Sequence, residues 1–370
     1  MHITRISVYQ VDLPVKGGGF HQSGGRIRYS VDTSVVRIDT DAGLSGWGET
    51  CPFGPDWNPA FAGGARAGME VMAPHLLGQD PREIAAVNQR MDRELYGIPY
   101  AKTGIDNACW DILGKATRLP VYSLLGGRLA DEFPFTGFVT IDTGPETVAL
   151  IDDYRQRGCN RFEFKGSGEP AVDIEMIRFV GGQMRSGDTF KIDANGGWKI
   201  DEALRVYEAT RDVHVLFEQP CATYEGCRAF KESTGRPVAL DECIHDVNDL
   251  LRAYQDQAID VLNIKTGRVG GLSKARQLRD LCVALGIRCH IQDTAGGEFN
   301  AAVIVHLAHS TPAGFLLSMW DCADLSATKI GSGLQRNDPD HVHRVYANTQ
   351  PGFGVEPHMD VLGKPVAVYA

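Results

Sequence analysis

Seven hydrophobic runs in the second half of the chain end on a charged or aromatic residue, and the endings recur at near-constant spacing. The endings are Lys165, Asp193, Glu218, Asp241, Lys265, Asp293 and the pair Trp320–Asp321. Successive endings lie 28, 25, 23, 24, 28 and 27 residues apart, counting to Trp320. Each step is the length of one strand plus one helix, which predicts parallel strands. A charge at the tip of every strand suits an active site better than a core.

The strand–helix pattern predicts an α/β fold with a (β/α)8 TIM-type barrel, in the modified (β/α)7β form because seven amphipathic stretches separate eight strands. In such barrels, catalytic groups lie where strands end and loops begin. The eight candidate strands are 133–141, 160–165, 189–195, 213–220, 236–242, 260–265, 287–293 and 314–321.

The first part of the chain has a different pattern. Alternating strands and the hairpin turn Asp41-Ala42-Gly43 precede helical periodicity at 65–77, 81–95 and 101–116. We therefore predict an α+β domain at 1–127, the barrel at 128–350, and a segment at 351–370 that returns to the first domain. The chain's 370 residues also exceed what one core usually supports.

Charge and cysteine usage narrow the class of protein. The net charge is −10 with no basic stripe, which argues against a nucleic-acid or anionic-membrane surface. No apolar run reaches the roughly 20 residues of a membrane span, and the start does not read as a signal peptide. Nine scattered cysteines without a CxxC pair indicate reduced packing residues. We expect a cytoplasmic protein that binds a small molecule.

Asp193, Glu218 and Asp241 end three successive strands and should face one small volume. Three carboxylates so close repel one another unless a cation lies among them. Ligation by oxygen alone indicates Mg²⁺ or a similar hard ion, with Mn²⁺ as an alternative. The other interpretation is that some of these acids form ion pairs with nearby lysines.

Lys165 and Lys265 end the second and sixth strands, which are diametrically opposed in a barrel of eight. The two lysines are therefore expected to flank a metal-bound substrate from opposite faces. Acting as a base near neutral pH requires a lowered pKa, which a neighbouring divalent cation favours. Glu163 alternates with Lys165 and is expected to pair with it or with Arg161, and pairing with Lys165 would raise the lysine's pKa.

The order of these residues resembles the enolase superfamily, and more closely the muconate-lactonising branch of the mandelate racemase family. The motifs are Lys165, Asp193-x-Asn195, Glu218-Gln219-Pro220, Asp241-Glu242, Lys265 and Gly270-Gly271-Leu272, with YAKTGIDNACWDILGKA resembling the family's capping domain.

The resemblance implies that Asp193, Glu218 and Asp241 bind Mg²⁺, and that one lysine removes the proton next to a carboxylate through an enediolate. Glu163, Glu242 and Asn263 would support them. Many relatives have Lys-x-Lys on the second strand, so Glu163 is a departure. The resemblance also implies a homo-oligomer.

Within the family, the chain is most similar to enzymes acting on proline derivatives, namely cis-3-hydroxyproline dehydratases and hydroxyproline betaine epimerases. Carboxylates and an aromatic face suit an ammonium group. Five residues are therefore candidates for contacting the substrate: Trp57, Asn195, Asp293, Trp320 and Asp321. Asn195 could instead form a turn, Trp320 and Trp57 could serve packing, and Asp321 could cap a loop. The glycine-rich segment 17–28 is a candidate lid.

We therefore expect a Mg²⁺-dependent enzyme that abstracts the α-proton of an amino-acid-like carboxylate and epimerises it. Dehydration of a 3-hydroxyproline is the alternative that shares the same intermediate. A barrel that only binds a ligand, and cycloisomerisation of a muconate-like diacid, are two further readings. The intact carboxylate triad argues against the first, and Asp293 and Asp321 argue against the second.

Overall fold

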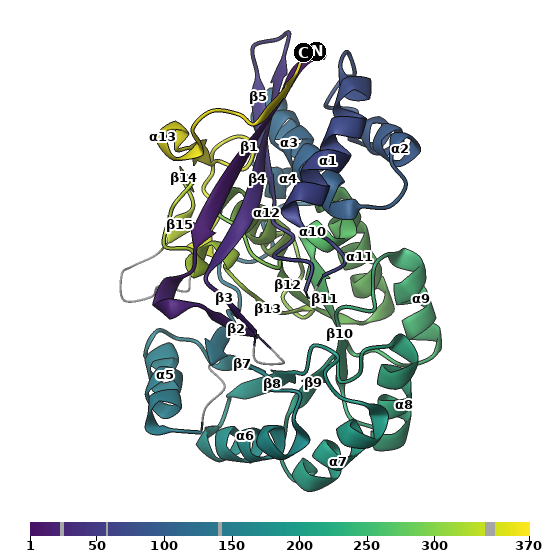
Figure 1. The fold of residues 1–370 in the computed structure, drawn as a ribbon, viewed down its shortest axis with the longest axis vertical. Coiled ribbons are helices and arrows are strands. Elements are labelled where there is room, and N and C mark those ends of the chain that lie inside the picture. The colour runs from purple at the N-terminus through teal and green to yellow at the C-terminus, as the bar shows by residue number, and fades with distance from the viewer. Residues whose placement is uncertain (23–25, 57, 140–142, 337–344) are drawn as a thin grey trace.

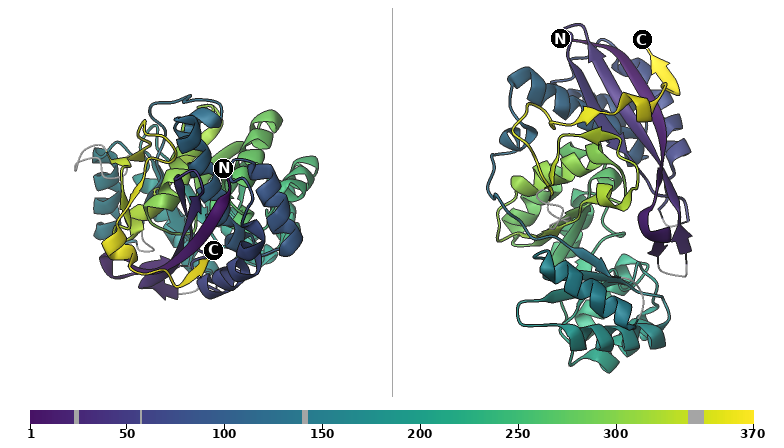
Figure 2. Two further views of the ribbon diagram at one scale, coloured as in Figure 1. Left: turned by 90° about the horizontal axis from the view of Figure 1, so that it is seen from above. Right: turned by 90° about the vertical axis from the view of Figure 1, so that its left-hand side faces the viewer.

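The computed structural model describes residues 1–22, 26–56, 58–139, 143–336 and 345–370. Both termini lie at one end of the molecule, on an antiparallel sheet, and barrel strands β7 to β9 lie towards the opposite end (Figure 1, Figure 2). The sheet near the termini has the order β18-β1-β4-β5. Its strands are β1 Ile3–Pro14, β4 Ser30–Thr40, β5 Ser45–Thr50 and β18 Ala367–Tyr369.

Two features of this sheet agree with the sequence pattern. The predicted hairpin joins β4 to β5, and Gly43 in its turn has a φ of 76°, which glycine adopts without strain. Strand β18 pairs with β1, so the end of the chain lies on the first sheet. The domain boundaries at 127 and 350 stay predictions.

Four helices accompany this sheet: α1 Ala62–Met72, α2 Ile84–Glu94, α3 Pro99–Thr117 and α4 Val121–Leu124. Helix α3 lies directly against β5, since a Cβ atom at Gly48 would stand 2.1 Å from the Gly104 carbonyl oxygen. The helix predicted from Pro81 begins at Ile84 instead. Asp80 accepts a hydrogen bond from the Arg82 N–H rather than capping a helix at that point.

Eight parallel strands form the second sheet in the order β13-β12-β11-β10-β9-β8-β7-β6. A parallel bridge between Phe135 and Met319 joins the two ends of this sheet, which closes the barrel. The predicted (β/α)7β order is therefore confirmed. The strands are β6 Gly137–Val139, β7 Arg161–Lys165, β8 Thr189–Asp193, β9 Leu216–Glu218, β10 Val238–Leu240, β11 Val261–Lys265, β12 Arg288–Gln292 and β13 Leu316–Met319.

Helices connect successive strands of the barrel. They are α5 Pro145–Gln156, α6 Pro170–Gln183, α7 Ile200–Thr210, α8 Tyr224–Thr234, α9 Val247–Gln255, α10 Thr266–Val269, α11 Leu272–Leu285 and α12 Glu298–His309. Every residue of α12 is buried, its four polar side chains included. Helix α12 contacts β5 of the first sheet as well as β12 and β13 of the barrel.

Short elements complete the described chain. They are η1 Lys16–Gly18, β2 Phe20–Gln22, β3 Arg26–Arg28, η3 Ala73–Leu76, η4 Cys322–Leu325, β14 Gly331–Ser332, β15 Gln335–Arg336, β16 Val345–Tyr346, β17 Glu356–Pro357 and α13 Met359–Leu362. Within the described residues, no helix has the length and apolar character that crossing a membrane demands. The cytoplasmic location and the homo-oligomeric state expected from the sequence stay predictions.

Candidate active site

The last residues of neighbouring strands lie side by side at one mouth of the barrel, which we call the C-terminal mouth. Lys165 pairs in register with Asp193, and Asp193 with Glu218. Asp241 directly follows β10, the strand beside β9. Strands β7 and β11 are four positions apart in the closed barrel, so Lys165 and Lys265 at their ends approach the mouth from opposite sides.

Three buried carboxylates at this mouth come close enough to hold one cation. One oxygen atom from each of Glu163, Asp193 and Glu218 lies within 4.8 Å of the other two. Burial raises the pKa of Glu218 well above its usual value, and the negative charge of Asp193 adds to this effect. A buried cluster of acidic oxygens with no thiolate or imidazole among its members suits a hard divalent cation.

Asp241, the third predicted metal ligand, lies in a different environment. Its Oδ2 accepts a hydrogen bond from Lys265 Nζ at 2.5 Å, and its Oδ1 accepts one from Arg268. Burial acts to raise the pKa of Asp241, but the positive charges of Arg268 and Lys265 hold it below its usual value. For Asp241, these contacts match the other interpretation given above, in which some of the three acids form ion pairs with nearby basic residues. In the oxygen cluster, Glu163 takes the place that was predicted for Asp241.

Lys165 lies among the clustered carboxylates. Its Nζ is 2.9 Å from Glu163 Oε1 and 2.5 Å from Asp193 Oδ2. Burial acts to lower the pKa of Lys165, but the negative charges of Asp193 and the two neighbouring glutamates raise it well above its usual value. The expected pairing with Glu163 is thus confirmed. It keeps Lys165 protonated until the negative charge around it is neutralised.

Two basic residues of the site were not identified from the sequence. Lys191 Nζ contacts Glu218 and lies 2.8 Å from Glu163 Oε2. Lys191 precedes Asp193 by two residues on β8, so the period of two could have revealed that both face the barrel interior. Arg268 lies in α10, beyond the strand pattern, and no strand periodicity indicates its contact with the site.

Lys165 and Lys265 both line one small pocket of about 20 Å³ at the C-terminal mouth. Aromatic side chains from both parts of the chain enclose it: Phe20 of β2 and Phe53 after β5, together with Phe138 of β6 and Trp320 after β13. The ring centroids of Phe138 and Trp320 lie 4.9 Å apart, and those of Phe20 and Phe53 lie 5.8 Å apart. Phe20 belongs to the segment predicted as a lid.

Asn195 and Asp293, both predicted to contact the substrate, line this pocket while their polar groups also bind the protein. Asn195 has a left-handed φ of 46°, and its Nδ2 donates to Asp193 at 2.9 Å and to Glu242 at 2.8 Å. The Asp293 carboxylate accepts hydrogen bonds from Thr266 and from two backbone N–H groups. Both residues therefore hold the rim of the pocket in place.

The other predicted residues are placed as follows. Trp320 is half-buried and lines the pocket, whereas the buried Asp321 accepts a hydrogen bond from the Ala323 N–H and caps η4. Trp57 lies outside the described residues. Of the residues predicted to support the site, Asn263 donates a hydrogen bond to Glu218. Burial, with the charges of the neighbouring aspartates, raises the pKa of Glu242 to about 6.

Two family models match the chain. Residues 22–126 match the mandelate racemase / muconate lactonizing enzyme N-terminal domain, and residues 146–361 match the enolase C-terminal domain-like family. The chain belongs to the mandelate racemase / muconate lactonizing enzyme family. Members of this family resemble the chain along its whole length, in sequence and in fold.

Three of these relatives bear on the site. A cis-3-hydroxy-L-proline dehydratase of Roseibium aggregatum is 42% identical, with 100% of both chains covered. An N-succinyl-L-Arg/Lys racemase of Bacillus cereus is 28% identical, covering 98% of this chain and 97% of the racemase. A magnesium complex of a mandelate racemase/muconate lactonizing enzyme from Roseovarius nubinhibens has a TM-score of 0.93 and 33% identity, with 100% of both chains covered.

Proposed function

We propose that this protein is a Mg²⁺-dependent dehydratase that removes water from cis-3-hydroxyproline or a closely related cyclic amino acid. The observation that carries the proposal is the placement of Lys165 and Lys265 on opposed strands, with both side chains lining one pocket beside buried carboxylates. The 42% identity to a cis-3-hydroxy-L-proline dehydratase along the whole chain supports the same reaction.

The acidic residues of the C-terminal mouth fit a divalent cation, and we propose that Asp193, Glu218 and Asp241 hold it. Asp193 and Glu218 are the last residues of β8 and β9, and Asp241 directly follows β10, whereas Glu163 lies two residues inside the end of β7. When bound, Mg²⁺ would hold the substrate carboxylate, stabilise the negative charge left by the departing α-proton, and offset the carboxylate charge that keeps Lys165 protonated.

Opposed lysines suit the stereochemistry of a cis-3-hydroxyproline. Its carboxylate and hydroxyl occupy the same face of the ring, so the α-hydrogen lies on the face opposite the hydroxyl. One lysine, as the free amine, takes the α-proton, and the other, as the ammonium, donates a proton to the leaving hydroxyl. The electrons of the Cα–H bond form the Cα–Cβ double bond, the C–O bond breaks, and water leaves. The product is a cyclic enamine, which tautomerises to the cyclic imine.

The lining of the pocket favours a cationic substrate such as a proline ring. The pocket must widen to admit a substrate, so its lining rather than its volume bears on the substrate class. The aromatic faces of Phe138 and Trp320 suit the ring ammonium of a proline, and the negative charge of Asp293 disfavours a second substrate carboxylate. These features support a pose with the ring nitrogen towards the aromatic side of the pocket.

Epimerisation of a proline derivative is the second candidate. The same pair of lysines permits it, because one can remove the α-proton while the other returns a proton from the opposite face. The likeness to an N-succinyl-L-Arg/Lys racemase favours this outcome. Epimerisation ranks second here because the dehydratase is 42% identical to the chain and the racemase 28%.

Proton NMR in D₂O separates the two reactions. The Mg²⁺-loaded protein is incubated in turn with cis-3-hydroxy-L-proline, its trans isomer and N-methylated prolines. We expect loss of the 3-hydroxyl from the cis compound, with the cyclic imine or its open keto-acid as product. An α-deuterated epimer without elimination would replace the dehydratase with an epimerase. Absence of both products and of α-proton exchange would leave only a binding role for the barrel.

A further inference from the structure

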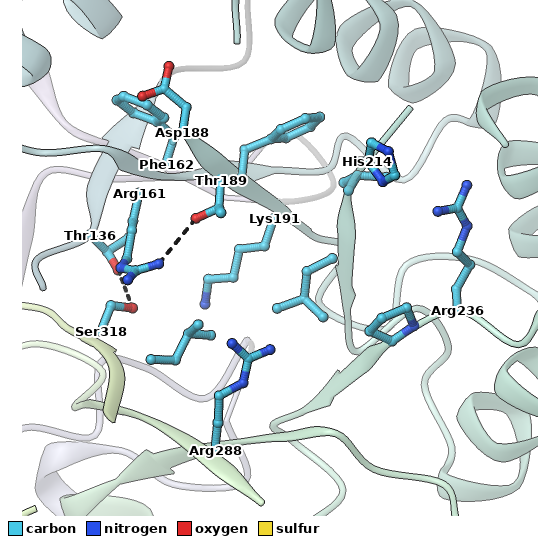
Figure 3. A pocket seen from close by; sticks show the side chains of 15 residues that line it. Thr136, Arg161, Phe162, Asp188, Thr189, Lys191, His214, Arg236, Arg288 and Ser318 are labelled. Carbon is cyan, nitrogen blue, oxygen red and sulfur yellow. Dashed lines mark hydrogen bonds between the residues drawn. The ribbon is translucent and has the colours of Figure 1, made fainter. Parts of the chain in front are cut away.

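A second cavity, of about 270 Å³, opens where the barrel strands begin, at the mouth opposite the two lysines (Figure 3). Several lining residues are the first residues of their strands: Arg161 of β7, Thr189 of β8, Leu216 of β9 and Arg288 of β12. We call this cavity the N-terminal mouth. Because the strands are parallel, it is separated from the C-terminal mouth by the length of the strands.

The charged groups that line the N-terminal mouth are mostly positive. They come from Arg161, Lys191, Arg236 and Arg288. Asp188 is the single carboxylate among the lining residues, all of which are described, and its Oδ2 accepts hydrogen bonds from the Arg155 guanidinium and the Arg185 N–H. The negative charge of Asp188 is therefore already used by groups that do not line the cavity.

Among the arginines and the lysine that line the N-terminal mouth, Arg161 and Arg288 have the fewest hydrogen-bond acceptors among the described residues. Arg161 donates only a long 3.5 Å hydrogen bond to Thr189 Oγ1, and its buried Nε has no partner among the described residues. Burial lowers the pKa of Arg161, and the positive charge of Arg288 lowers it further. The two guanidinium groups line the same cavity and repel each other. A buried donor without an acceptor is costly, and an anion between the two groups would remove that cost.

Hydroxyl groups and a third cation complete the lining. Thr136 and Ser318, which hydrogen-bond to each other at 2.8 Å, lie on the Arg161 side in Figure 3. Lys191 extends from β8 between Arg161 and Arg288 in the same view, while its Nζ contacts the carboxylates of the barrel interior. Arg236 is engaged elsewhere, since its guanidinium donates to the Arg211 carbonyl oxygen. The guanidinium donors of the cavity that the described residues leave without a close acceptor are thus those of Arg161 and Arg288.

We propose that the N-terminal mouth is a binding site for a compact, multiply charged oxyanion, with Arg161 and Arg288 as its principal ligands. Arginine forks match planar carboxylate and phosphate oxygens, and two forks across one cavity select an anion with oxygens on more than one side. A phosphate group and a small dicarboxylate share this chemistry, and both fit a cavity of about 270 Å³. The proposal is independent of the reaction at the C-terminal mouth.

Isothermal titration calorimetry of the Mg²⁺-loaded protein tests this site. Inorganic phosphate, succinate and chloride are titrated at one ionic strength into the wild-type protein, into Arg288→Gln and into Arg5→Gln. Arg288 is exposed, so its substitution should not disturb folding, and the exposed Arg5 on β1 is the matched control. We expect saturable binding of phosphate or succinate but not of chloride, with affinity about tenfold lower or more in Arg288→Gln and unchanged in Arg5→Gln.

The outcomes distinguish a phosphorylated ligand from a carboxylate ligand, and either ligand from the absence of an anion site. Tighter binding of phosphate identifies a phosphorylated ligand, and tighter binding of succinate identifies a carboxylate. Equal affinities of the wild type and Arg288→Gln for phosphate and succinate would overturn the proposal. So would binding of chloride as tight as that of these anions, or a failure of phosphate and succinate to saturate the protein in the millimolar range. Arg161→Gln, checked for folding by circular dichroism, must weaken binding in the same direction.

Discussion

The basic side chains at the two mouths of the barrel differ in whether they have carboxylate partners. At the C-terminal mouth, Lys165 and Lys265 each lie within 2.5 Å of a carboxylate oxygen. At the N-terminal mouth, the described residues give Arg161 and Arg288 no carboxylate partner. The difference indicates which kind of charged ligand each mouth can accept. The first end must exchange internal ion pairs for a cation and a substrate, and the second offers uncompensated donors to an anion.

The strongest test of the C-terminal mouth replaces its two lysines in turn. We expect Lys165→Ala and Lys265→Ala each to lower kcat for elimination by about 10³-fold or more, because a positioned acid or base is lost. The variant that lacks the acid should still exchange the α-proton in D₂O, whereas the variant that lacks the base should not. Lys364→Ala, on an exposed lysine, is the control. Equal activity in all three variants would remove the lysines from the mechanism.

The third metal ligand is the next point to sharpen. Asp241→Asn should weaken Mg²⁺ binding by more than about 100-fold, and Glu163→Gln by about 10 to 100-fold, because Glu163 is proposed to act through its neighbours. Calorimetric titration of Mg²⁺ into each variant gives both affinities. The reverse order would assign the ion to Glu163, Asp193 and Glu218, the cluster whose oxygens already lie within 4.8 Å.

The contact that holds the first sheet to the C-terminal mouth should depend on pH. Glu49 accepts hydrogen bonds from Thr33 and from the N–H groups of Gly297 and Asn300, yet burial raises its pKa from 4.5 to about 7. The unfolded chain therefore loses this proton first as the pH rises. The stabilisation from protonated Glu49 is full below pH 4.5 and is lost through pH 7, by roughly 3 kcal/mol in total.

Chemical denaturation at pH 4.5 and pH 8 measures this effect. The wild-type free energy of unfolding should fall relative to that of Glu49→Gln by about that amount between the two pH values. Glu175→Gln, on the exposed side of α6, should follow the wild type. If Glu49→Gln kept the full pH dependence of the wild type, Glu49 would be ionised in the folded protein throughout this range.

The smallest expected effect comes from the N-terminal mouth. Arg288→Gln should leave kcat within about twofold of the wild type in the absence of added phosphate or dicarboxylate, because Arg288 lies at the opposite end of β12 from the pocket. Steady-state rates at saturating substrate measure this. A large loss of kcat in a correctly folded variant would mean that the two mouths are not separate, and it would break the comparison.

The sequence predicted the positions of the strand ends well, because a period of two and a repeat near 25 residues are local signals. Lys165, Asp193, Glu218 and Lys265 are indeed the last residues of their strands. Strand starts were predicted less well. The run at 213–220 gives a strand only from Leu216 to Glu218, because alternation along the chain does not require pairing with a neighbouring strand.

Partner choice within the site depends on the fold rather than on local pattern. Asp241 is paired with Arg268, which follows a different strand, and Glu163 joins the oxygen cluster through its contacts with Lys165 and Lys191. The N-terminal mouth could not be predicted for the same reason. Its residues begin strands that are far apart in the sequence, and only closure of the barrel brings them together.

A crystal structure of the protein with Mg²⁺ and L-proline tests the central claim most directly. L-Proline carries the carboxylate and the ring ammonium but lacks the leaving hydroxyl, so it cannot undergo the elimination reaction. We predict one Mg²⁺ held by Asp193, Glu218 and Asp241, with the α-carbon between the amines of Lys165 and Lys265 and each amine about 3 Å from one face. An α-carbon with both amines on the same face, or an ion away from these carboxylates, would contradict the account.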